Sequence, residues 1–95
     1  MLAVIARLKV IEDKTEHFLA VMKELSQKVH TEEKGCLQYQ LCRARDGNNF
    51  VMIERYADKT ALKIHGETPH FIQAQAEFAK CLAARPEIEI FSVVE

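Results

Sequence analysis

The apolar residues at the start of the chain change their spacing, from every second position to every third or fourth. Positions 2–11 alternate, with Leu2, Val4, Ala6, Leu8 and Val10 on one side, and this predicts a strand with one buried face. The later spacings predict one face of a long helix, formed by Phe18, Val21, Met22, Leu25 and Val29. Asp13 and Glu16 predict a capping box at its start, with Thr15 as the rival cap, and Gly35 predicts a left-handed cap at its end.

The rest of the chain predicts three more strands and two shorter helices. Strands are expected over 36–45 and 49–57, joined by the turn signal Asp46-Gly47-Asn48. Asp58 should cap a short helix that carries His65, and Thr68-Pro69 should start a second one, with an apolar face of Phe71, Ala74, Phe78 and Leu82. Pro86 should stop that helix before a last strand over 87–94. The order β-α-β-β-α-α-β predicts an α+β, ferredoxin-like split βαβ fold, with a four-stranded antiparallel sheet and helices on one face.

Length and charge exclude several classes of protein. Ninety-five residues predict one domain over 1–95, and a net charge of -1 without a basic stripe argues against nucleic acid as a partner. No apolar run is long enough for a membrane span, and the start lacks signal-peptide features, so we expect no membrane partner and a cytoplasmic location. Cys36, Cys42 and Cys81 are expected as reduced thiols.

Both faces of the predicted sheet are apolar, as Cys36 and Cys42 opposite Leu37 and Leu41 illustrate. One chain offers nothing to cover the second face. We therefore expect a homodimer that pairs sheet against sheet.

Hairpin parity predicts a polar cluster on one sheet face. A turn of even length pairs odd positions of 36–45 with even positions of 49–57, so Tyr39, Leu41 and Arg43 should share a face with Met52, Glu54 and Tyr56. That cluster could line a functional pocket. The alternative is an Arg43–Glu54 ion pair within a structural surface.

Two histidines flank the break between the short helices. His65 lies on the apolar side of its helix, where burial lowers a histidine pKa and keeps the ring neutral, as a general base requires. His70 lies in the first turn of the next helix, where the helix dipole disfavours imidazolium. The alternative for each is a structural ring bonded to a nearby carbonyl. No third metal ligand is spaced with them, and no nucleotide or flavin motif is present, so no metal or other cofactor is expected.

Three segments of the chain form a recognisable set: Glu33-Lys34-Gly35-Cys36-Leu37-Gln38-Tyr39, Phe50-Val51-Met52-Ile53-Glu54-Arg55-Tyr56, and His65-Gly66-Glu67-Thr68-Pro69-His70-Phe71. Together they resemble the antibiotic biosynthesis monooxygenase family. Their order and spacing match the family over nearly the whole chain.

The resemblance implies a dimeric α+β barrel with a small pocket in each monomer. It implies an oxidoreductase, a cofactor-free monooxygenase that deprotonates a quinol-like or polyketide-like phenol so that the substrate itself reduces oxygen. On this basis we expect His65, His70, Glu54 and Tyr39 as catalytic residues, and Arg43, Tyr56 and Phe71 as residues that bind a small aromatic substrate.

The sequence differs from the family's pattern in one respect. It contains no tryptophan, and Tyr56 stands where many relatives have one. Gln75 stands near the place of the haem-ligating histidine of haem-degrading relatives, which makes that activity a poor match. Two alternatives stay open: a sugar-phosphate isomerase of the autoinducer-processing type, and a non-catalytic dimeric ligand-binding protein.

Overall fold

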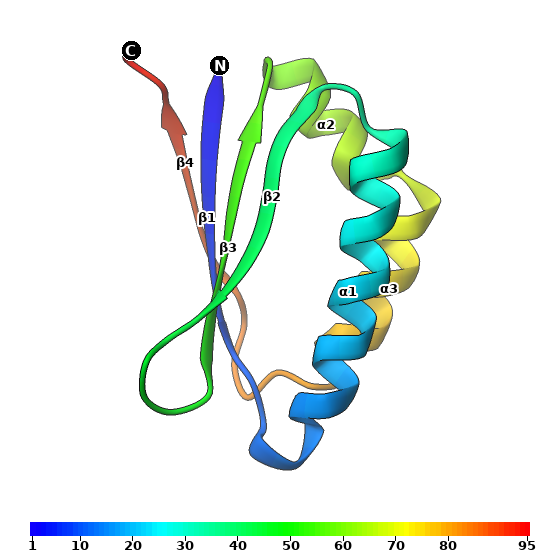
Figure 1. Ribbon diagram of the computed structural model, residues 1–95, viewed down its shortest axis with the longest axis vertical. Coiled ribbons are helices and arrows are strands. Elements are labelled where there is room, and N and C mark those ends of the chain that lie inside the picture. The colour runs from blue at the N-terminus through cyan, green and yellow to red at the C-terminus, as the bar shows by residue number, and fades with distance from the viewer.

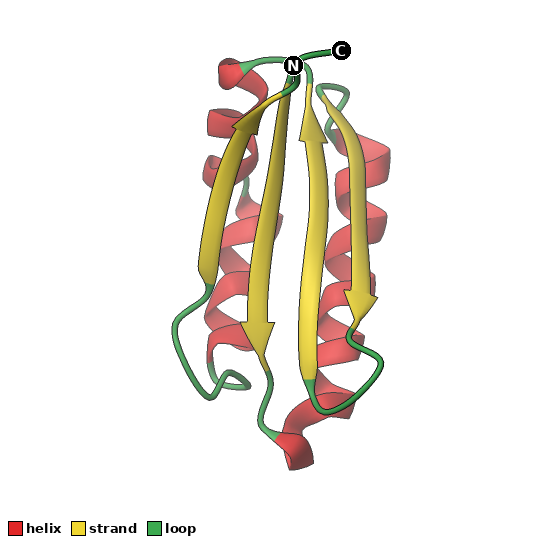
Figure 2. Cartoon of the chain, turned by 90° about the vertical axis from the view of Figure 1, so that its left-hand side faces the viewer, coloured by secondary structure: helices red, strands yellow, loops and turns green.

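The computed structural model describes residues 1–95, which form one antiparallel sheet covered by helices on one face. In chain order the elements are β1 (Leu2–Lys9), the 3-10 turn η1 (Glu12–Lys14), α1 (Thr15–Glu32), β2 (Cys36–Arg43), β3 (Asn49–Tyr56), α2 (Lys59–Glu67), α3 (Pro69–Ala79) and β4 (Glu87–Ser92). The strands lie in the order β2-β3-β1-β4, and all neighbours are antiparallel. Figure 1 shows the sheet edge-on with α1 and α3 along one side, and Figure 2 shows the opposite, uncovered face. The predicted α+β ferredoxin-like fold is confirmed.

The core lies between the sheet and the helices. The alternating face of β1 is buried, and so is the predicted stripe of α1, with Phe18, Met22, Leu25 and Val29 each no more than 2% exposed. Phe18 packs against Phe50 of β3 and Phe78 of α3, with ring centroids 5.1 and 6.4 Å apart. Apolar spacing therefore located the strand and helix faces correctly, because burial of those faces is what holds the two layers together.

Several predicted element ends are wrong. Instead of an Asp13–Glu16 capping box, η1 precedes α1, and the N-cap residue Lys14 makes no side-chain cap bond. Gly35 is not a left-handed cap, since the one positive φ in the chain is that of Gly47 in the β2–β3 turn. The third helix ends at Ala79, before Leu82 and Pro86, and Leu82 instead pairs with Val10 in an isolated bridge.

The two caps predicted around the short helices are confirmed. The Asp58 carboxylate accepts from the Ala61 backbone N–H at 2.8 Å, and the Thr68 hydroxyl accepts from the Phe71 N–H at 3.2 Å with Pro69 at the first helical position. These caps fix where α2 and α3 meet, and therefore where His65 and His70 lie.

No helix of the chain combines the length and the apolar character needed to cross a lipid bilayer.

Candidate active site

The β2–β3 register brings polar side chains to the helix-covered face. Tyr39 lies opposite Glu54, and a bulge between Cys36 and Gln38 places Cys36 opposite Tyr56. The Tyr56 hydroxyl donates to Glu54 Oε1 at 2.6 Å, and both side chains are buried. The parity prediction is confirmed, because the Ala44 N–H bonds to the Asn49 carbonyl and closes a loop that preserves it.

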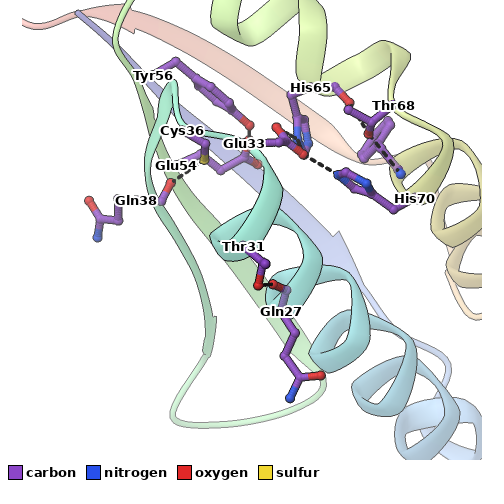
Figure 3. Close-up of polar contacts among 11 residues, drawn as sticks. Gln27, Thr31, Glu33, Cys36, Gln38, Glu54, Tyr56, His65, Thr68 and His70 are labelled. Atoms are coloured by element: carbon purple, nitrogen blue, oxygen red, sulfur yellow. Dashed lines mark hydrogen bonds and ion pairs between the residues drawn. The ribbon is translucent and has the colours of Figure 1, made fainter.

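A buried carboxylate, Glu33, lies between the two predicted histidines. The Nδ1 of His65 is 2.9 Å from Glu33 Oε1, and the Nε2 of His70 is 2.6 Å from Glu33 Oε2. The side chains of Glu33 and His65 are 5% exposed and that of His70 is 8% exposed. Figure 3 shows Glu33 between the two rings, with Glu54 and Tyr56 nearby. A carboxylate is purely an acceptor, so each ring presents an N–H to it.

The local backbone explains why Glu33 reaches the histidines. Glu33 is the C-cap residue of α1, and its side chain meets the end of α2 because the two segments approach closely at Gly35. A Cβ on Gly35 would lie 2.6 Å from the Ala61 Cβ, and the Gly35 carbonyl accepts from the Ala57 N–H at 2.9 Å. Only glycine permits this approach, which brings the start of β2 against α2.

The free edge of His65 faces a cavity between the sheet and the short helices. The cavity has a volume of about 200 Å³, and eleven of its sixteen lining residues are hydrophobic. These residues come from all four strands and from α1, α2 and α3. Tyr39, Glu54 and Gln75 add polar groups, and no lysine or arginine lines it. The His65 ring lies 5.1 Å from that of Tyr39 and 4.6 Å from that of Phe71, centroid to centroid.

Among the polar groups of the cavity, the Nε2 of His65 and the hydroxyl of Tyr39 have no protein partner. Neither atom makes a hydrogen bond, and no buried side-chain nitrogen or oxygen in the structure lacks one. Both atoms are therefore accessible, and the space that their residues share is the cavity. A molecule in the cavity can therefore hydrogen-bond to the Nε2 of His65 and to the hydroxyl of Tyr39.

Burial shifts the titration of the cavity groups toward their neutral forms. Burial lowers the pKa of His65, although the Glu33 carboxylate opposes that change. Burial also raises the pKa of Glu54, against the hydrogen bond from Tyr56, and raises the pKa of Tyr39. The predicted direction for His65 is confirmed. A neutral ring with a free Nε2 can accept a proton.

The remaining predicted site residues lie in different surroundings. Phe71 lines the cavity, whereas Tyr56 is fully buried behind it and contacts Glu54. Arg43 lies opposite Phe50, over whose ring its guanidinium sits at 5.1 Å, and donates to the Asn48 side chain. The alternative of an Arg43–Glu54 ion pair is therefore wrong, because the two residues lie at different levels of the sheet.

Glu33 is the site residue that sequence reasoning missed, although the quoted family segment begins with it. One physical signal was present. A carboxylate at a helix C-terminus meets the negative end of the helix dipole and needs donors nearby. His65 and His70 supply them. No three His, Cys, Asp or Glu side chains are grouped so as to hold a metal ion.

Comparison with known proteins places this geometry in a family. The family model described as "Antibiotic biosynthesis monooxygenase" matches residues 1–77. The chain is 38% identical to "Putative monooxygenase YcnE" of Bacillus subtilis (strain 168) over 85 residues, which is 88% of each protein. It is 27% identical to "Putative monooxygenase Rv0793" of Mycobacterium tuberculosis, over 98% of this chain and 91% of that one.

Solved structures give the same answer. A structure described as a "putative antibiotic biosynthesis monooxygenase" from Caulobacter crescentus CB15 superimposes with a TM-score of 0.96 at 39% identity, covering 99% of this chain and 90% of that one. The structure of Rv0793 gives a TM-score of 0.92 at 26% identity, covering 99% and 95%. The chain belongs to the antibiotic biosynthesis monooxygenase family. Family and relatives together support a monooxygenase-like function.

Proposed function

We propose that this protein is a monooxygenase that oxidises a small, neutral phenol or hydroquinone, with His65 as the general base. The observation that carries the proposal is the His65 ring, whose Nδ1 is held by buried Glu33 while its Nε2 faces an apolar cavity. A carboxylate that orients an imidazole in this way fixes the tautomer whose free nitrogen accepts a proton.

The reaction needs a proton acceptor and an electron-rich substrate. His65 Nε2 takes the hydroxyl proton, and the resulting phenolate donates electrons to dioxygen through a ring carbon, which forms a C–O bond. The peroxide takes the proton back from His65, and the hydroperoxide so formed loses its outer OH together with the hydrogen on the same ring carbon, as water, which leaves a quinone carbonyl. A phenol plus dioxygen thus becomes a quinone plus water, and the substrate supplies all four electrons. Tyr39, with its free hydroxyl, is placed to orient the substrate oxygen, and Phe71 to stack on its ring.

Cavity size and charge support this substrate class. An engineered cavity of about 150 Å³ in another protein holds benzene, so about 200 Å³ has room for one substituted ring or a compact fused pair. The lining carries no lysine or arginine. This argues against the sugar-phosphate isomerase alternative, because a phosphate needs cations or several donors.

The test is oxygen uptake with 1,4-dihydroxynaphthalene and substituted hydroquinones, with chelator present and flavin excluded. We expect uptake by the wild type and a kcat lower by about 10²–10⁴-fold in His65→Ala, the usual contribution of a general base. The control is His30→Gln, since His30 is exposed on α1. Binding of these compounds without oxygen uptake would favour the non-catalytic binding alternative. An unchanged kcat in His65→Ala, with a much lower melting temperature, would make His65 a structural residue.

We also propose a homodimer formed through the uncovered sheet face (Figure 2). On that face Ile5 lies beside Ile53, and Phe91 of β4 is 43% exposed. Covering these side chains would bury apolar surface that a single chain leaves in water. We expect light scattering at micromolar concentration to give a dimer and Ile5→Glu to give a monomer. The matched control is Ile72→Glu, because Ile72 is 55% exposed on α3. A monomeric wild type would contradict the proposal.

A further inference from the structure

The cluster of Glu33, His65 and His70 lies between the cavity and two grooves on the outer side of the helical layer. His65 lines the cavity of about 200 Å³, but His70 does not. His70 instead lines a groove of about 190 Å³ between α1 and α3, and a second one where α1 ends beside α2 and α3. The cluster therefore connects the interior of the site to the outside of the helical layer.

Each histidine ring uses one nitrogen for Glu33 and leaves the other without a protein partner. His65 binds Glu33 through Nδ1 and leaves Nε2 free, whereas His70 binds through Nε2 and leaves Nδ1 free. Because no buried polar side-chain atom lacks a partner, His70 Nδ1 is accessible, and the spaces that His70 lines are the two outer grooves. The two free nitrogens thus face different spaces.

We propose that His70 is a second proton-transfer residue, which releases a proton to the outer grooves when His65 takes one from the substrate. The inference rests on the proposed function of His65. In the resting state of this proposal His70 is the one imidazolium of the cluster, with N–H groups at both ring nitrogens, and the Glu33 carboxylate at 2.6 Å offsets the unfavourable helix dipole. The substrate O–H bond then breaks and an N–H bond forms at His65 Nε2. His70 Nδ1–H then breaks, and its proton goes to water in the grooves. Glu33 keeps one N–H from each ring throughout, so no proton has to cross it.

The physical reason is that one buried carboxylate balances one imidazolium. A second imidazolium would leave an uncompensated positive charge in a cluster whose side chains are no more than 8% exposed, and burial makes that unfavourable. Protonation of the two rings is therefore coupled. In agreement, burial is the main factor that lowers the pKa of His65, Glu33 raises it, and the His70 charge lowers it further.

No other charged group near the cluster takes the place of Glu33 as the partner of the two histidines. The titratable groups nearest the cluster are Tyr39, Glu54 and Tyr56 on the cavity side and Cys36 in the groove beside Glu33. Burial raises the pKa of each of them. The charged residues that share the two grooves with His70 are Glu24, Lys28, Glu77, Glu32, Lys34 and Asp58. None of these six makes an ion pair with either histidine of the cluster.

The first experiment needs no substrate. The pH titration of the His65 ring nitrogens is followed by ¹⁵N NMR in the wild type, in His70→Gln and in the control His30→Gln. Gln can still donate to Glu33 but carries no charge, so we expect His65 to take up its proton at higher pH in His70→Gln than in the other two proteins. His70→Asn replaces His70→Gln if the latter does not fold. Superimposable His65 curves in all three proteins would overturn the inference.

The second experiment measures proton release. Wild type is mixed anaerobically with 1,4-dihydroxynaphthalene in weak buffer with an indicator dye, and phenolate absorbance is recorded in parallel. We expect about one proton released per phenolate in the wild type and none in His70→Gln, where the proton stays on His65. Equal release in both proteins would overturn the inference. Absence of phenolate in the wild type would contradict the proposed substrate instead, and the NMR comparison would still decide the coupling.

Discussion

The two buried tyrosines of the site differ in what their hydroxyl groups contact. Tyr56 donates to Glu54 at 2.6 Å, whereas the Tyr39 hydroxyl has no protein partner and opens into the cavity. One phenol therefore satisfies a buried carboxyl group, and the other is left for a ligand. The same substitution should have opposite consequences at the two positions.

We predict that Tyr56→Phe destabilises the protein by about 1–3 kcal/mol, the range for a buried acceptor that loses its donor. Tyr39→Phe should change the free energy of unfolding by only a few tenths of a kcal/mol, because no protein hydrogen bond is lost. Urea unfolding of both variants tests this. A Tyr39→Phe protein as unstable as Tyr56→Phe would mean that the Tyr39 hydroxyl has a structural partner.

Sequence patterns located most of the site residues but not their partners. Parity placed Tyr39, Glu54 and Tyr56 on one face, since alternation along a strand is a geometric rule. The same rule gives the face on which a side chain lies but not its position along the strand, so it could not exclude the alternative of an Arg43–Glu54 ion pair. Glu33 was missed because its contact with the histidines joins the end of α1 to α2 and α3, through tertiary packing that no local pattern records.

At the scale of elements, the approach of β2 to α2 at Gly35 determines where Glu33 lies. A methyl group on Gly35 would overlap Ala61, whereas one on Gly66, within α2, would meet no atom within 4 Å. The two glycines therefore have different roles, although both lie in the segments that resemble the family. Sequence alone suggested a left-handed cap for Gly35, and the structure shows close packing instead.

We predict that Gly35→Ala destabilises the protein by about 1–3 kcal/mol, as expected for overpacking, and loosens the Glu33–His65 contact. Gly66→Ala should stabilise it by roughly 0.4–1 kcal/mol, because it lowers the entropy of the unfolded chain without a clash. Thermal unfolding of both variants is the measurement. Combining Gly35→Ala with Ala61→Gly should recover most of the loss, and failure to do so would place the strain elsewhere.

Local signals predicted the elements better than their ends. The caps at Asp58 and Thr68 were correct because each is a bond within a few residues. The ends of α1 and α3 were not. α3 stops at Ala79 because the chain then turns to pair Leu82 with Val10, a contact across 72 positions that spacing cannot anticipate.

For the molecule as a whole, the site makes stability depend on pH. Burial lowers the pKa of His65 below its ordinary value of 6.5, so the unfolded chain takes up a proton at a pH where the folded chain does not. The contribution of His65 is present above pH 6.5 and is lost as pH falls through the lower folded-state pKa. Glu54 acts in the opposite sense, since its raised pKa stabilises the fold below 4.5 and that contribution is lost as pH rises through the raised value.

We predict that the free energy of unfolding of the wild type falls more steeply between pH 7.5 and 5.5 than that of His65→Gln, which lacks this titration. The control variant is His30→Gln, because it also removes a histidine but at an exposed position on α1. Chemical unfolding at intervals across this range measures the three slopes. Parallel slopes for wild type and His65→Gln would show that His65 titrates alike in the folded and unfolded chains.

The edge strand β4 gives the cavity a wall that can report on its contents. Ile88 and Ile90 line the cavity while staying 61% and 58% exposed, and β4 pairs with β1 alone. An edge strand of this kind opens locally at low free energy, and a molecule bound against it stabilises the closed form by mass action. Amide hydrogens over Glu87–Ser92 should therefore exchange more slowly when the cavity is filled, while those in the middle of α1 change little. Slowed amide exchange along this strand would therefore identify which candidate ligands bind in the cavity, before any reaction is known.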